Sequence, residues 1–181
     1  IRSTERLLKI AQETNRKIHV LHISTKDEIL ILKKFKNFSP CEVTPQHLFF
    51  HAPDCYENLG SLAQMNPPIR DKSHNIGLWK GIEEKIVDVI GSDHAPHTLD
   101  EKKKKYPNCP SGMTGVQTIL PIMLDFVNKE KLGINDLVRL LCYNPAKIYN
   151  MKYKGEIKIG NDADFSIADL NKEFTITNEW I

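Results

Sequence analysis

The sequence has 181 residues, of which 40% are hydrophobic and 27% are charged, and its formal net charge at pH 7 is +2. This composition is typical of a soluble globular domain with a real core. The small net charge argues against a nucleic acid or an anionic membrane as the main partner. No apolar run is long enough to cross a bilayer. Four scattered cysteines without a C-x-x-C pair favour free thiols in a reducing compartment, the cytoplasm.

Helical and strand patterns alternate along most of the chain. Ser3 and Thr25 can cap the first two helices, and Glu28 stands at capping-box spacing from Thr25. The final helix has an apolar face through Leu137, Leu140 and Leu141. The predicted elements, in chain order, are a helix over 3–17, a strand over 18–23, a helix over 24–38, a strand over 41–45, a helix from 77, a strand over 86–91, and helices over 114–132 and 134–151.

This alternation predicts an α/β fold with parallel βαβ units, in which chemistry lies at the carboxyl ends of the strands. His22 ends the strand predicted over 18–23, and Asp93 follows the strand predicted over 86–91 within "GSDHAPHTLDEK". An imidazole and a carboxylate at two strand ends are both metal-type ligands. We therefore expect His22 and Asp93 to converge on one point.

The pattern changes after Met151. Ile157 and Ile159 alternate with polar residues, and glycines interrupt the segment, which predicts short antiparallel strands in a small separate sheet. We therefore predict two domains, residues 1–150 and 151–181. The chain begins without methionine and stops within this β pattern, so we expect it to be part of a longer protein.

Seven segments in order carry a specific resemblance: "HVLHIST", "CEVTPQHL", "NPPIR", "SDHAPHTLDEK", "PSGMTGVQT", "NPAKIYN" and "KGEIKIGNDADFSIADL". Together they resemble the C-terminal half of a class I dihydroorotase of the amidohydrolase superfamily. The resemblance implies the last part of a metal-dependent (β/α)8 barrel with part of a small β-sandwich. It also implies reversible cyclisation of N-carbamoyl-L-aspartate to L-dihydroorotate, a step of pyrimidine synthesis.

The same resemblance implies roles for individual residues. His22 would be a zinc ligand, and Asp93 a metal ligand that also acts as general base, in a site with one or two Zn²⁺ ions. Asn66 would bind the ring or its carboxylate, and His97 the carboxylate. The backbone of Ser111 and Gly112 would contact the pyrimidine ring.

Other polar residues receive no role in the chemistry. His94 is interpreted as structural despite its ligand-like spacing. Gln46 and His47 stand where the family often has two histidines, neither of which is a metal ligand. Arg70 is expected at the surface or in a local pair. The lysine run 102–105 is expected to be a solvated loop, with a mobile lid as the alternative.

The resemblance also implies ligands that this sequence lacks: an H-x-H on the first strand, a bridging lysine or aspartate on the fourth and a histidine on the fifth. We therefore expect residues 1–181 alone to be inactive. A homodimer and an association with aspartate transcarbamoylase are possible assemblies for the family. The alternatives are another cyclic amidohydrolase, such as a dihydropyrimidinase or allantoinase, and a non-catalytic dihydroorotase-like subunit.

Overall fold

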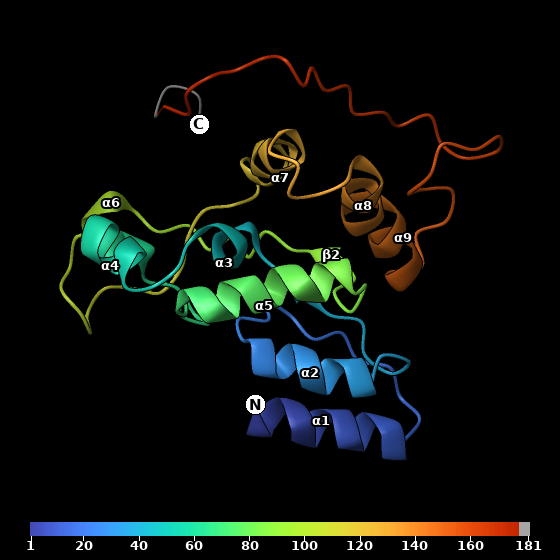
Figure 1. The fold of residues 1–181 in the computed structure, drawn as a ribbon, viewed down its shortest axis with the longest axis horizontal. Coiled ribbons are helices and arrows are strands. Elements are labelled where there is room, and N and C mark those ends of the chain that lie inside the picture. The colour runs from blue at the N-terminus through green and yellow to red at the C-terminus, as the bar shows by residue number, and fades with distance from the viewer. Residues whose placement is uncertain (178–181) are drawn as a thin grey trace. The chain divides into compact units, whose positions relative to one another are not determined.

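The computed structural model describes residues 1–177 (Figure 1). The chain divides into two compact units, Ile1–Val116 and Gln117–Ile181. The helices and strands of the first unit are α1 Arg2–Glu13, α2 Lys26–Lys34, β1 Glu42–Val43, α3 Pro45–Phe49, α4 Asp54–Leu59, the 3-10 helix η1 Gly60–Ala63, α5 Lys72–Glu83, β2 Val89–Ile90 and α6 Leu99–Lys102. Those of the second unit are α7 Ile119–Asn128, α8 Ile134–Val138, the π-helix η2 Arg139–Tyr143 and α9 Asn144–Ile148.

Parallel pairing of consecutive segments organises the first unit. β1 and β2 are parallel, with Val43 opposite Ile90. The segment before β1 joins them through a parallel bridge between Val20 and Cys41, and the N–H of Ile23 donates to the carbonyl of Glu42 at 2.8 Å. Since α2 and α5 connect these neighbouring segments, the structure confirms the predicted parallel βαβ arrangement, although the regular strands are only two residues long.

The helices α1, α2 and α5 lie side by side on the outside of this pairing (Figure 1). Leu32 of α2 and Leu78 of α5 are buried in the core. Two glycines on one face of α5 allow the close approach of α2. A Cβ at Gly77 would overlap the Cβ of Lys26, and one at Gly81 would lie 3.0 Å from the Cδ1 of Ile29. The packing of α5 on α2 therefore depends on these missing side chains.

Local capping chemistry sets the starts of α2 and α5 but not that of α1. Thr25 caps α2, where its hydroxyl accepts from the N–H of Glu28 at 3.2 Å, as predicted. The prediction for Ser3 is wrong, because α1 begins at Arg2 and Ser3 lies inside its first turn. α5 begins before the predicted residue 77, because the Asp71 carboxylate accepts from the N–H of Ser73 at 2.8 Å and caps a start at Lys72.

The helical segment predicted over 134–151 is interrupted in the second unit. α8 runs into a π-helical turn, Arg139–Tyr143, and then into α9, which has Pro145 in its first turn. Proline has no N–H to donate, so the regular hydrogen-bond ladder cannot continue through residue 145. Leu137 and Leu140 are buried, in agreement with the predicted apolar face.

The antiparallel strands predicted after Met151 are absent from residues 151–177, which form turns and extended coil. Ile159 and Ile167 are almost fully exposed there. The alternating pattern is present in the sequence, but a strand requires a partner, and the part of the chain that the structure describes supplies none. Residues 178–181 of the predicted second domain lie outside the described residues.

None of the helices within residues 1–177 combines the length and the apolar character that crossing a membrane would require.

The four thiols differ sharply in accessibility, which gives a first prediction. Cys41, Cys55 and Cys109 are buried and Cys142 is exposed. Burial raises the pKa of Cys41 to about 12 and also raises that of Cys55, and the thiolate is the reactive form. We expect a thiol reagent to label Cys142 rapidly in the native protein, with the others reacting only in denaturant. Peptide mass spectrometry would locate the label. Rapid native labelling of Cys41 would contradict the described core.

Candidate active site

The two predicted metal ligands share an unusual backbone conformation. His22 has φ 37° and Asp93 has φ 44°, both in the left-handed region. Of the other left-handed non-glycine residues in the described chain, Asn15, Lys85, Glu130 and Asn150 lie two residues beyond a helix end, where such residues commonly terminate a helix. Tyr153 lies in a turn of the second unit. His22 and Asp93 instead follow parallel extended segments. Strained residues outside helix ends cluster at functional sites, where the surroundings hold them in place.

A buried histidine, His47, lies within electrostatic range of both predicted ligands. Its Nε2 is 3.0 Å from the carbonyl of Pro67, which can only accept, so Nε2 carries the proton. Its Nδ1, 2.8 Å from the Thr44 hydroxyl, therefore accepts. Burial lowers the pKa of His47, with smaller influences from the Pro67 hydrogen bond and from the charges of His22 and Asp93. The sequence analysis assigned His47 no role. Its position just after the end of a strand is the feature of the sequence that could have indicated one.

The burial of His47 predicts a pH dependence of stability. Its folded pKa lies below the ordinary value of 6.5, so the unfolded chain binds the proton more readily. Its contribution to stability is complete above about pH 6.5 and is lost as the pH falls below that value, by at most about 1.4 kcal/mol per pH unit. Urea unfolding of the wild type and of His47→Gln from about pH 8 to pH 5 would measure this. The variant should show a shallower loss, and equal slopes would contradict the prediction.

His22 lines a depression of about 760 Å³ in the first unit. Pro67, Arg70 and His74 contribute to the same wall. Arg70 is exposed, in agreement with the prediction, and it lines the same pocket as His22, the predicted metal ligand. A guanidinium there gives the pocket a group suited to a carboxylate or another anion. Its position four residues after Asn66 in "NPPIR" was the only signal in the sequence.

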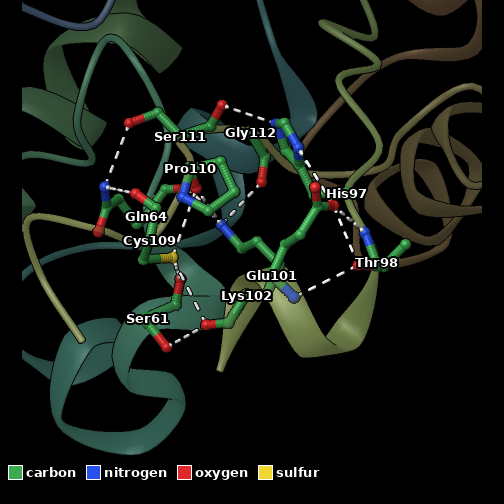
Figure 2. Close-up of polar contacts among 10 residues, drawn as sticks. All are labelled: Ser61, Gln64, His97, Thr98, Glu101, Lys102, Cys109, Pro110, Ser111 and Gly112. Atoms are coloured by element: carbon green, nitrogen blue, oxygen red, sulfur yellow. Dashed lines mark hydrogen bonds and ion pairs between the residues drawn. The ribbon is translucent and has the colours of Figure 1, made fainter. Parts of the chain in front are cut away.

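The predicted substrate-binding residues come from segments that hydrogen bond to one another (Figure 2). The Nε2 of His97 is 3.3 Å from the carbonyl of Ser111, and the N–H of Gly112 donates to the carbonyl of Gln64 at 3.0 Å. The side-chain amide of Gln64 donates to the Ser111 hydroxyl at 3.3 Å. His97, Ser111 and Gly112 are thus brought together, and Asn66 lies two residues beyond Gln64 on the same segment.

Gly112 has a backbone that only glycine adopts easily, with φ 152°. A Cβ there would lie 2.6 Å from the carbonyl of Ala95 and 3.1 Å from the Cδ2 of His97. The glycine therefore allows the 111–112 segment to approach the histidine. This close approach supports the interpretation of Gly112 as a position where backbone, not side chain, faces the site.

His94 has a structural role, as predicted. Its Nδ1 accepts from the N–H of Gly115 at 3.1 Å and of Val116 at 3.4 Å. The side-chain amide of Gln46 donates to the carbonyl of Ser92 at 3.1 Å and to that of Thr114 at 3.3 Å, and so contacts both segments. The two side chains fix the segment that follows Gly112 against the one that contains Asp93.

The lysine run 102–105 is not uniformly solvated, contrary to the prediction. Lys102 is only 5% exposed, whereas the side chain of Lys103 is 71% exposed. Lys102 ends the short helix α6, whose start carries a capping box between Thr98 and Glu101. The T-x-x-E spacing of the capping box is visible in the sequence. The burial of Lys102 is not, because the four lysines of the run are identical in sequence.

The donor types at this site suit a metal, but the described residues provide only part of a ligand set. Within residues 1–177, no group of three or more His, Cys, Asp and Glu side chains gathers closely enough to hold an ion. His22 and Asp93 supply an imidazole and a carboxylate, which are ligands that zinc uses. Two ligands do not complete a tetrahedral site, so further ligands would have to come from elsewhere.

Comparison with known proteins agrees with these features. Residues 6–181 match the amidohydrolase family. Dihydroorotase from Pyrococcus furiosus is 39% identical over 177 residues, which are 97% of this chain and 41% of that protein. Dihydroorotase from Ehrlichia canis is 38% identical over 161 residues, 87% of this chain and 36% of that protein. The chain thus spans less than half the length of these relatives.

Solved structures show the same relationship. L-hydantoinase (dihydropyrimidinase) from Arthrobacter aurescens superimposes with a TM-score of 0.85 at 32% identity, over 90% of this chain and 38% of that one. Dihydropyrimidinase from Brevibacillus agri superimposes with a TM-score of 0.82 over the same shares at 23% identity, which shows the fold alone. The family match over nearly the whole chain and the shared fold lead to one conclusion: the chain belongs to the amidohydrolase family.

Proposed function

We propose that this chain is the C-terminal part of a zinc-dependent dihydroorotase, with a (β/α)8 barrel and a small β-sandwich, which interconverts N-carbamoyl-L-aspartate and L-dihydroorotate. One observation carries the proposal: His22 and Asp93 both have a left-handed backbone, and both follow extended segments of the same parallel set. The identity to dihydroorotases over almost the whole chain supports this substrate.

In this proposal His22 and Asp93 would hold zinc together with ligands from outside the described residues. Zinc, when bound, supplies polarisation of a carbonyl and lowers the pKa of water. In ring opening, Asp93 accepts a proton from the water that attacks the ring carbonyl, and the proton passes to the departing ring nitrogen. In cyclisation, protonated Asp93 gives its proton to the departing hydroxyl, which leaves as water.

The remaining residues bind the substrate. His97 and Asn66 would hold the carboxylate and the ring through hydrogen bonds, and the backbone at Ser111 and Gly112 would contact the ring. Arg70, in the wall of the pocket that His22 lines, adds a positive charge for the anionic substrate. The proposed enzyme acts in pyrimidine synthesis in the cytoplasm. It would form a homodimer or associate with aspartate transcarbamoylase.

A second candidate is a hydantoinase or dihydropyrimidinase, which the structural similarity to the Arthrobacter aurescens enzyme favours. The two functions differ in the ring carboxylate. A site built to bind that group should reject rings that lack it by about 10⁴-fold in kcat/KM, because its polar residues would be left unpaired.

The test uses protein expressed from the complete reading frame that encodes this chain, loaded with zinc. Ring opening is measured for L-dihydroorotate, dihydrouracil, hydantoin and allantoin. The proposal expects selective turnover of L-dihydroorotate, and none from residues 1–181 alone. Selective turnover of dihydrouracil or hydantoin would favour the second candidate, and a protein inactive on all four would indicate a non-catalytic subunit.

A further inference from the structure

The ammonium group of Lys102 is fully engaged inside the protein (Figure 2). Its Nζ donates to the carbonyls of Gln64 at 2.8 Å, Pro110 at 3.1 Å and Gly112 at 3.0 Å. A lysine ammonium has three donors, so these carbonyls use all of them. Among residues 1–177 no carboxylate lies within ion-pair distance of this Nζ. The three carbonyl dipoles therefore take the place of both water and a counter-ion.

The backbone of Lys102 is held as firmly as its side chain. Its carbonyl accepts from the Ser61 hydroxyl and from the Cys109 thiol, the latter at 3.4 Å. The capping box fixes the other end of α6, where the Glu101 carboxylate accepts from the N–H of Thr98 at 2.9 Å. Because His97 directly precedes Thr98, the position of α6 also determines the position of this histidine.

The segments that Lys102 connects are those that carry the proposed substrate-binding residues. Gln64 lies two residues before Asn66, and the carbonyls of Pro110 and Gly112 flank Ser111. We infer that Lys102 is a positioning residue, whose ammonium holds the Asn66 segment, the Ser111–Gly112 segment and the His97 end of α6 in one substrate-binding arrangement. This inference rests on the proposed function and extends it to a residue outside the direct contacts with the substrate.

The geometry excludes a direct role for this lysine in the reaction. Its three N–H groups are already used and the residue is 5% exposed, so it has no donor left for a substrate. Loss of the ammonium would remove a donor from all three carbonyls. The carbonyl of Gln64 would keep its bond from the N–H of Gly112, whereas the buried carbonyl of Gly112 would have no other partner among residues 1–177. These segments would then separate or admit water, and the substrate contacts would lose their spacing.

The test compares Lys102→Met with Lys103→Met in zinc-loaded protein from the complete reading frame. Methionine keeps an unbranched stem and removes all three donors, while Lys103 is the exposed neighbour in the same run. We expect Lys102→Met to raise the KM for L-dihydroorotate by about 10- to 100-fold, with zinc content unchanged. Lys103→Met should keep the wild-type KM. Hydrogen exchange at the Gly112 amide, which donates to Gln64, should become faster only in Lys102→Met.

A purely structural role would lower the melting temperature and the folded fraction without changing KM. An active wild type with the same KM in Lys102→Met, or an equal rise in Lys103→Met, would therefore overturn the inference. If Lys102→Met does not fold, Lys102→Gln replaces it, because its shorter amide cannot reach all three carbonyls; a wild-type KM there would also overturn it. A wild type without dihydroorotate turnover defeats the proposed function instead, and the inference with it.

Discussion

Replacing Asp93 with asparagine is expected to lower kcat for L-dihydroorotate by about 10²–10⁴-fold. Asparagine has nearly the same shape, but its amide cannot take the proton that the proposed mechanism assigns to the carboxylate. It also tolerates the left-handed backbone of this position, at φ 44°, better than most residues. The fold should therefore persist, and a thermal melt close to that of the wild type would separate lost chemistry from lost structure.

Asp100→Asn is the matched control for this experiment. Asp100 lies in the same segment, its side chain is 95% exposed, and its ion pair with Lys103 is long, at 3.6 Å. We expect this variant to keep wild-type kcat, because surface pairs of this kind contribute little. Turnover by Asp93→Asn above about one tenth of the wild-type rate would remove Asp93 from the role of general base.

Replacing Gly77 with alanine is expected to destabilise the protein by about 1–3 kcal/mol. Helix propensity alone predicts the opposite sign, a gain of about 1 kcal/mol for alanine inside a helix. The added Cβ would overlap the Cβ of Lys26 and lie 3.1 Å from its Cα. These atoms belong to the start of α2 and cannot move like the end of a flexible side chain, so α2 and α5 would have to separate.

Urea unfolding of Gly77→Ala would measure this change in stability. Lys80→Ala on the same helix is the control, because the side chain of Lys80 is 70% exposed and its replacement should change stability by less than about 0.5 kcal/mol. A Gly77→Ala protein more stable than the wild type would mean that helix propensity outweighs the contact between α2 and α5.

The sequence by itself determined the features that depend on neighbouring residues. The Thr25 cap needs only the N–H three residues later, and the alternation of helices and strands needs only local periodicity. The pattern placed His22 and Asp93 after extended segments, and the resemblance selected Asn66, His97, Ser111 and Gly112 as residues of one site. The structure brings the segments of these four residues together through the contact of the His97 ring with the Ser111 carbonyl and through backbone hydrogen bonds.

The tertiary structure decided everything that needs a distant partner. Lys102 cannot be distinguished from Lys103 in a run of four lysines, because its burial depends on carbonyls from residues 64, 110 and 112. Gly77 has no signal beyond its identity, since the backbone of α2 approaches it only in the folded chain. The alternating residues after Met151 formed no strand within the described chain, because a β pattern specifies which face is buried but cannot supply the strand that pairs with it.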